Sequence, residues 1–331
     1  MTHSLRASDA SSASRGDASP GVSFVVPVYN KARELPAMLH ALGQQDGDFR
    51  REFIFVDDGS TDESVAIVEE ASRGWRDVRI VRQRNAGSAN ATNVGLAHAT
   101  MPLVKFVDAD DLLAPDATRR LRDALLAHPD AVLAYADRVS FRASEIPDLV
   151  PSRRPPAVDR IERPLGPAIR NSMFNPTQFL ARTDICRQVG GCDERVVFSQ
   201  EYSLTLRLAF RGPFVHLRQV LAYILEANDN RLSNNQARQL QRVTRALRLF
   251  CEDYPDLPAQ YRRFACRRAT GRAWRFARRE LGAGVMSPWF RLYLLGWVSS
   301  GGNAGDLIRA CERVYDHALG AGAPSVARLA G

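Results

Sequence analysis

The sequence predicts an α/β fold in which a mostly parallel sheet is flanked by helices and followed by a C-terminal helical region. From residue 22 onward, short β-branched runs alternate with amphipathic segments, as in right-handed βαβ units. From about residue 235 the apolar residues keep helical spacing to the end of the chain. The 331 residues are 45% hydrophobic and 25% charged, which is typical of a protein with a packed core.

The elements follow one another in a regular order. Residues 1–20 are rich in Ser, Ala, Asp and Gly and are expected to form a disordered leader, because no apolar segment marks a secretory signal. Five strands are expected at residues 23–26, 53–56, 78–81, 103–107 and 131–135. Helices are expected at residues 33–44, 62–72, 89–97 and 116–127, the second opening on a capping-box spacing from Ser60 to Glu63. A proline-rich connection over residues 138–170, a helix at 201–210 and short strands near 215 and 222–225 come next.

The net charge of +8 arises in one segment. Residues 238–280 hold twelve arginines against four acidic residues, and the rest of the chain is balanced. The basic character therefore acts locally. Five scattered cysteines without a CxxC pair argue against disulfides and structural zinc and favour a reducing cytoplasmic compartment. No apolar run reaches the ~18 residues of a membrane-spanning helix.

Polar residues collect where the predicted strands end. In a parallel sheet the carboxyl ends of the strands border the ligand crevice, so these residues are expected to face one site. The segments are Pro27-Val28-Tyr29-Asn30, Asp57-Asp58-Gly59-Ser60, Asn85-Ala86-Gly87-Ser88 and Asp108-Ala109-Asp110-Asp111.

The acidic run at residues 108–111 predicts a divalent cation. Three neighbouring carboxylates repel one another unless a cation or hydrogen bonds compensate, and oxygen ligands suit Mg²⁺ or Mn²⁺. Taken alone, Asp110 or Asp111 could equally cap the helix that follows. Tyr29 could stack on a base and Asp57 could accept a hydrogen bond from it, although a rim tyrosine and a turn aspartate are the simpler interpretations. Neither GxGxxG nor GxxxxGK[ST] is present, so the metal would have to neutralise bound phosphates.

Five segments in this order resemble the motifs of the family 2 glycosyltransferases over about residues 22–225. They are VSFVVPVYNKARELPAML, EFIFVDDGSTDES, NAGSANATNVGLAHA, VKFVDADDLLAPD and VGGCDERVVFSQEYSLTLRLAFRG. The resemblance implies a GT-A fold, a nucleotide-diphospho-sugar donor with UDP expected, a divalent metal and inversion at the anomeric carbon. It also implies that the sugar transfer is a step in glycan or glycolipid synthesis.

The resemblance further implies roles for individual residues. Pro27 and Tyr29 would line the base and Asp57 would contact it. Asp108 and Asp110 would form the DxD pair that holds the metal and the ribose-diphosphate, with Asp111 as an auxiliary acid. Glu201, in the first turn of its helix, falls on the position of the catalytic base, although an acid favoured by the helix dipole is the plainer interpretation.

Three departures from the family pattern leave alternatives open. Gln200 replaces an acid, Thr92 stands where many members have arginine, and residues 223–228 hold no histidine where the family has one. Asn228, Asp229 or Asn230 could supply an oxygen ligand instead. One alternative is therefore a protein that binds nucleotide-sugars without transfer. A nucleotidyltransferase is disfavoured, because no glycine-rich phosphate loop accompanies Lys31 and Arg33.

The chain is expected to divide into the leader, a GT-A domain over residues 21–227 and a helical region over 228–331. Acceptor specificity is expected within residues 138–200, including Asn171, Asn175 and Gln178. Within residues 261–298, arginines accompany an aromatic stripe of Trp289, Tyr293 and Trp297. Such a surface favours peripheral contact with the inner face of a membrane carrying a lipid-linked or glycan acceptor, or else two helices packed on the catalytic domain. No motif indicates nucleic-acid binding.

Overall fold

A computed structural model describes residues 19–151, 154–196, 200–226 and 236–320. Within these ranges nine strands form one sheet in the order β3-β2-β1-β4-β8-β6-β9-β5, with β7 paired to β9. The expected leader falls almost wholly in residues 1–18, which lie outside the described residues. The strands are β1 Val22–Val28, β2 Arg51–Asp57, β3 Val78–Arg82, β4 Leu103–Phe106, β5 Leu112–Leu113, β6 Leu133–Phe141, β7 Ala157–Ile161, β8 Phe179–Arg182 and β9 Phe214–Leu225.

The sheet has a parallel half and a mixed half. Strands β1 to β4 pair in parallel, as predicted from the alternation of strands and helices. Strand β8 then enters antiparallel between β4 and β6, and β5 and β7 pair antiparallel with the long strand β9. The α/β class with flanking helices is confirmed, and four of the eight strand pairings within the described residues are parallel.

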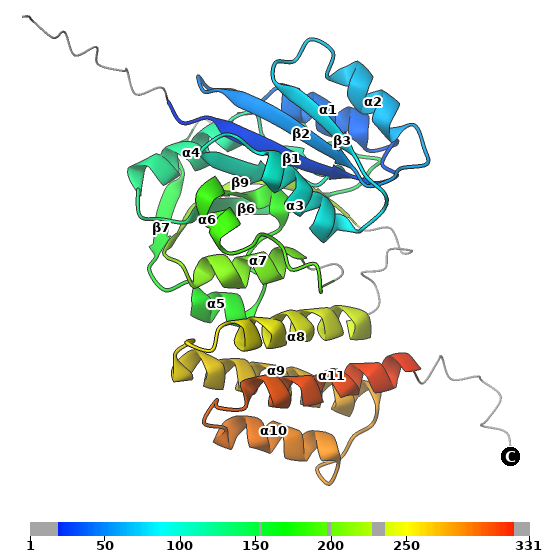
Figure 1. Cartoon of the computed structure of the whole chain (residues 1–331), viewed down its shortest axis with the longest axis vertical. Helices are drawn as coiled ribbons and strands as arrows, with labels where there is room; N and C mark the ends of the chain where they lie inside the picture. Colours follow the sequence, from blue (N-terminus) through cyan, green and yellow to red (C-terminus); the bar gives the residue numbers. More distant parts are fainter. Residues whose placement is uncertain (1–18, 152–153, 197–199, 227–235, 321–331) are drawn as a thin grey trace, which may run out of the picture.

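Helices cover both faces of the sheet (Figure 1). Alternate side chains of β1 point to opposite faces, because successive residues of a strand do so. Phe24 and Val26 pack with α1, α2 and α4, whereas Val25 packs with α3, α6 and α7. The helices of this part are α1 Leu35–Gly43, α2 Ser64–Ala71, α3 Ser88–His98, α4 Ala117–Ala127, α5 Leu165–Arg170, η1 Pro176–Gln178, α6 Thr183–Gln188 and α7 Gln200–Ala209.

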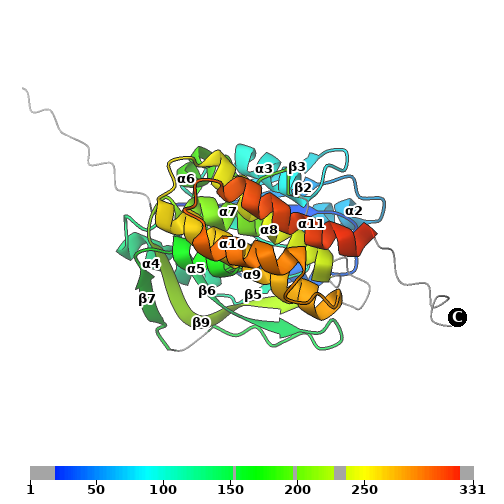
Figure 2. The same cartoon turned by 90° about the horizontal axis from the view of Figure 1, so that it is seen from below.

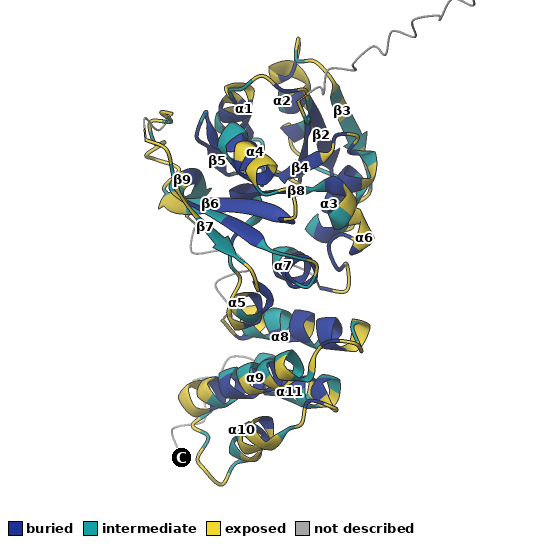
Figure 3. Ribbon diagram, turned by 90° about the vertical axis from the view of Figure 1, so that its left-hand side faces the viewer, coloured by how far each residue is buried: buried dark blue, intermediate teal, exposed yellow. Residues whose placement is uncertain are grey.

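The C-terminal helices stack below the sheet on the side of α5 and α7 (Figures 1 and 2). They are α8 Gln236–Asp253, α9 Ala259–Glu280, α10 Pro288–Val298 and α11 Ala304–Gly320. Helix α8 packs on α7, and α9 packs on α5. One apolar core runs from Val25 of the sheet to Tyr315 of α11, so the helices and the sheet share buried surface (Figure 3).

One expectation for an individual segment is corrected, and the aromatic stripe within residues 261–298 lies on α10. Helix α2 begins at Ser64 with Glu63 at its N-cap and no side-chain cap bond, so Ser60 and Glu63 do not form a capping box. The aromatic stripe of α10 is not uniformly exposed: Trp289 packs against the core, whereas Trp297 is 52% exposed. In the described part of the chain no helix combines the length and the apolar character that a bilayer span requires.

Candidate functional site

The loops after β1 and β2 are fastened to each other. The backbone N–H groups of Asn30 and Lys31 donate to the hydroxyls of Ser60 (3.1 Å) and Ser64 (2.8 Å). In return, Thr61 N–H donates to Asn30 Oδ1 over 2.8 Å. Asn30 adopts a left-handed backbone with φ 49°, which asparagine tolerates better than most residues. These hydrogen bonds fix the backbone from which the side chains of Tyr29 and Lys31 project.

A cavity of about 340 Å³ lies at the carboxyl ends of the parallel strands. All four polar segments that follow the predicted strands contribute to it, so the sequence correctly predicted that they share a crevice. Its walls include Pro27, Tyr29, Lys31, Asp108 and Asp110. Tyr29 is 47% exposed and offers its ring at the rim.

The acidic run divides between the cavity and the interior. Asp108 and Asp110 both line the cavity. Asp111 instead accepts hydrogen bonds from the hydroxyl of Thr177 (2.7 Å) and the backbone N–H of Leu225 (3.2 Å), and it is buried. The turn is closed by Asp111 N–H donating to Asp108 O over 3.1 Å. Asp111 therefore ties η1 and β9 together, and its role as an auxiliary acid stays a prediction.

The residues that line the cavity include more acidic than basic side chains. Burial, with the nearby carboxylates of Asp111 and Asp110, raises the pKa of Asp108 well above its usual value, and Lys31 acts in the opposite direction. Lys31 Nζ lies 2.5 Å from Asp110 Oδ2. A cation held by Asp108 and Asp110 would favour their ionised forms, so the electrostatics suit one.

The two carboxylates fit Mg²⁺ or Mn²⁺ as partial ligands. Both ions bind oxygen, and Mg²⁺ typically takes one or two carboxylates and completes its sphere with phosphates and water. Among the described residues, no three His, Cys, Asp or Glu side chains are grouped so that they could hold a metal ion by themselves. Asp108 and Asp110 would therefore hold the ion together with oxygens of a bound diphosphate.

The paired acids Asp57 and Asp58 at the end of β2 have different environments. Asp57 is buried and accepts from Ser60 N–H over 3.0 Å, and it is not among the residues that line the cavity. Asp58 does line it, and its carboxylate accepts from the backbone N–H groups of Ala86 and Gly87, both at 2.8 Å. Asp58 thereby holds the loop of the third βα connection against the cavity. Whether Asp57 contacts a base stays a prediction.

Glu201 lies beside the cavity, in the first turn of α7. A small adjoining cavity of about 10 Å³ is lined by Glu201 and shares Pro27 and Asp108 with the larger one. Burial raises the pKa of Glu201 to about 7. A carboxylate with this pKa can exist in either protonation state near neutral pH, as a general base requires.

Among the residues named for the departures from the family pattern, Thr92 has a described side chain. Thr92 is buried, lines the small cavity and donates to Ser88 O over 2.7 Å, so its hydroxyl bonds to the preceding turn of α3. The side chain of Gln200 lies outside the described residues, and so do Asn228, Asp229 and Asn230.

Two residues at the cavity were not singled out from the sequence. Lys31 directly follows Tyr29-Asn30 at the end of a strand. This position is the feature of the sequence that could have predicted its place at the cavity. Glu194 lines the cavity from the connection before α7 and accepts from Asn90 Nδ2 (3.0 Å) and Asn93 Nδ2 (2.8 Å). Glu194 stands in the fifth motif, within VGGCDER, but its contacts could not be predicted because its partners lie about a hundred residues away.

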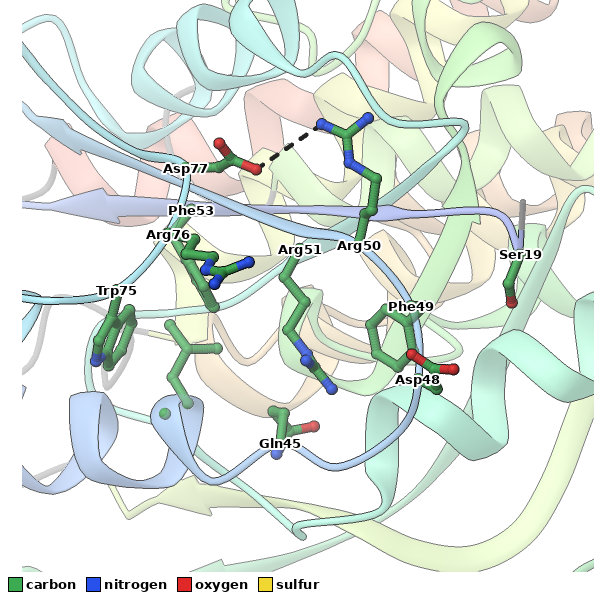
Figure 4. A pocket seen from close by; sticks show the side chains of 12 residues that line it. Ser19, Gln45, Asp48, Phe49, Arg50, Arg51, Phe53, Trp75, Arg76 and Asp77 are labelled. Carbon is green, nitrogen blue, oxygen red and sulfur yellow. Dashed lines mark ion pairs between the residues drawn. The ribbon is translucent and has the colours of Figure 1, made fainter.

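A larger cavity of about 630 Å³ lies at the opposite edge of the sheet (Figure 4). It is lined by residues that precede the strands, including Ser19 before β1, Arg50 and Arg51 at the start of β2, and Asp77 before β3. Because open α/β sheets bind ligands at the carboxyl ends of their strands, we assign the functional site to the smaller, acidic cavity.

Comparison with known proteins identifies the class of protein to which this fold and its acidic cavity belong. A family model described as glycosyl transferase family 2 matches residues 23–189, about half of the chain. The chain belongs to this family.

Curated relatives align over part of their length. The uncharacterized glycosyltransferase YibD of Escherichia coli K12 is 37% identical over 94 residues, which are 28% of this chain and 27% of YibD. The undecaprenyl-phosphate 4-deoxy-4-formamido-L-arabinose transferase of Sodalis glossinidius is 35% identical over 117 residues, 34% of this chain and 35% of that enzyme. The chain thus spans about a third of the length of these relatives.

Solved structures match nearly the whole chain. Residues 1–349 of Staphylococcus aureus TarS in complex with UDP-GlcNAc superpose with a TM-score of 0.61 at 17% identity, covering 90% of this chain and 92% of TarS 1–349. The mannosyltransferase PcManGT of Pyrobaculum calidifontis, in complex with GDP-Man and Mn²⁺, superposes with a TM-score of 0.53 at 19% identity, covering 91% and 89%. At these identities the likeness shows the shared fold, and the expected GT-A architecture with C-terminal helices is confirmed.

Proposed function

We propose that this chain is an inverting, metal-dependent glycosyltransferase that moves a sugar from a nucleotide-diphospho-sugar, with UDP as the expected nucleotide, to an acceptor hydroxyl. The observation that carries the proposal is the position of Asp108, which lines both the cavity at the strand ends and the small cavity beside Glu201. A diphosphate held at Asp108 would bring the reacting carbon next to a carboxylate. The named complexes of TarS with UDP-GlcNAc and of PcManGT with GDP-Man and Mn²⁺ support the donor class and the metal.

In the proposed reaction the acceptor oxygen attacks the anomeric carbon from the face opposite the diphosphate. The bond from that carbon to the phosphate oxygen breaks, and the nucleoside diphosphate leaves with the bonding electrons. Glu201 takes the hydroxyl proton, a contribution of about 10²–10⁴ in rate. Mg²⁺ or Mn²⁺, when bound, supplies positive charge to the departing diphosphate. Pro27, Tyr29 and Asp57 are proposed to border the base.

We further propose that residues 21–227 carry catalysis and that residues 228–331 contact the inner face of the cytoplasmic membrane, where a glycan or lipid-linked acceptor is presented. The outer side of α10 and the turn before it expose Met286 (80%), Leu295 (53%) and Val298 (80%). Apolar side chains beside a basic helix suit an anionic bilayer surface. The name of the undecaprenyl-phosphate transferase supports a lipid carrier in this family.

Calorimetric titration with UDP, with and without Mn²⁺, followed by a transfer assay with a panel of UDP-sugars, tests the proposed reaction. We expect binding that requires Mn²⁺ and is lost in Asp110→Asn. Glu145→Gln, which neutralises an exposed acid on the irregular connection, is the matched control and should bind as the native chain does. Metal-independent binding, or donor binding without transfer to any glycan or lipid-linked acceptor, would contradict the proposal.

A further inference from the structure

Another cavity, of about 390 Å³, lies between α8, α9 and the chain that follows α5. Its wall on the α9 side contains four arginines, Arg268, Arg272, Arg275 and Arg279. We call this cavity the arginine pocket. The spacing of these arginines places them on one face of the helix, along about 16 Å of its axis. Asn171 and Ser172 close the cavity on the side of α5, and its remaining lining residues are uncharged.

Of the four arginines of the pocket, Arg279 pairs with Glu280 over 2.6 Å, and the other three have no carboxylate partner within 4.0 Å among the described residues. Arg268 and Arg272 instead donate to the carbonyl oxygen of Arg170, each over 2.7 Å. Burial together with the charges of Arg272 and Arg275 lowers the pKa of Arg268 to about 10. An anion in the cavity would relieve this repulsion.

One donor of the pocket is left without a protein acceptor. Nη1 of Arg272 is buried and has no hydrogen-bond partner among the described residues, which is costly for a charged group. Guanidinium groups bind phosphate oxygens through paired, charge-assisted hydrogen bonds. Four guanidinium groups facing one hollow suit a multiply charged phosphate better than a single carboxylate.

The arginine pocket lies close to the catalytic cavity. Asn171 lines the pocket, and Pro176, five residues further along the chain, lines the small cavity with Asp108 and Glu201. Five residues span at most about 18 Å, which limits the separation of the two hollows. A second connection runs through α7: the charge of Arg272 acts on the hydroxyl of Tyr202, the neighbour of Glu201. An extended acceptor could therefore reach both places.

We propose that the arginine pocket binds a phosphate or pyrophosphate group of the glycan acceptor and thereby holds the acceptor hydroxyl toward Glu201. This assignment rests on the proposed glycosyl transfer and adds to it the chemical class of the acceptor. The sequence placed acceptor specificity in residues 138–200, and of the three residues named there Asn171 alone lines this cavity. Asn175 and Gln178 form the capping box of η1 instead.

Calorimetry with inorganic pyrophosphate in metal-free buffer tests the pocket. The pocket variant Arg275→Gln/Arg279→Gln should weaken binding roughly tenfold or more, because charge-assisted hydrogen bonds are lost. The control variant Arg263→Gln/Arg278→Gln removes the same charge from exposed positions of α9 outside the cavity and should change binding less than about twofold. No binding to the native chain, or equal losses in both variants, would overturn the assignment.

Two further measurements distinguish this assignment from binding of a lipid headgroup and from the proposed glycosyl transfer itself. Cosedimentation with phosphatidylglycerol vesicles should be equal for the two variants, and a selective loss in the pocket variant would identify a lipid headgroup as the ligand and overturn the glycan assignment. Binding of UDP with Mn²⁺ should be unchanged in both variants. If the native chain binds UDP with Mn²⁺ but not pyrophosphate alone, the arginine pocket fails while the proposed function stands.

Discussion

The ammonium nitrogen of Lys31 lies 2.5 Å from a carboxylate oxygen of Asp110, and the two side chains are 27% and 11% exposed. This ion pair joins the loop after β1 to the turn after β4. It places a protein cation on one of the two carboxylates that we propose as metal ligands. Lys31 and a divalent ion would thus interact with the same carboxylate.

Replacing Lys31 tests this competition. In Lys31→Met we expect the affinity for Mn²⁺ alone to rise about fivefold, since a partly exposed ion pair contributes roughly 1 kcal/mol. Electron paramagnetic resonance of free Mn²⁺ during a titration measures the change. Arg33→Met, on the same loop, should leave the affinity unchanged. Weaker Mn²⁺ binding in Lys31→Met would mean that Lys31 supports the site rather than competes for it.

Glu201 should govern the pH dependence of transfer. The carboxylate form accepts the proton, so kcat should rise as pH increases through about 7 and level off above it, with a bound cation moving the rise to lower pH. Glu201→Gln should lower kcat about 10²–10⁴-fold and remove the rise, while the Kd for the donor stays within twofold. Steady-state rates from pH 5.5 to 9 with calorimetry of the donor provide the test. A parallel loss of donor affinity would assign Glu201 a structural role.

Asp58 should affect both stability and donor binding. In Asp58→Ala the backbone N–H groups of Ala86 and Gly87 lose their acceptor, which should lower the free energy of unfolding by about 1–3 kcal/mol. The loop at the cavity would also loosen, so affinity for UDP should fall. Urea unfolding and calorimetry measure the two effects. Asp123→Ala, at an exposed acid on α4, should change neither by a comparable amount.

The exposed face of α10 should control binding to vesicles. Leu294→Ser/Leu295→Ser removes two half-exposed apolar side chains and should reduce cosedimentation with anionic vesicles several-fold. Ile146→Ser/Val150→Ser removes two exposed apolar side chains from the connection after β6 and serves as the control. Equal binding of both variants would rule out α10 as the contact surface.

Local patterns in the sequence were sufficient to predict β1 to β4, the start of β6 and parts of β9, whereas β5, β7 and β8 were not predicted. The runs at 53–56 and 103–107 became β2 and β4, because apolar β-branched segments bounded by polar turns have few other ways to bury their side chains. The crevice followed as well, since parallel strands bring their carboxyl ends to one edge. The antiparallel insertion of β8 was not predictable, because its pairing with β4 joins residues more than seventy positions apart.

The sequence by itself determined the alternation of strands and helices, the acidic run at the cavity and the basic character of the last helices. These depend on residue types at short spacing. Only the tertiary structure decided that Asp110 faces Lys31 while Asp111 turns inward to Thr177, and that four arginines of α9 surround a hollow near Asn171. The reason is physical: a side chain's charge and hydrogen bonds depend on partners brought together by packing, and the order of residues alone does not name those partners.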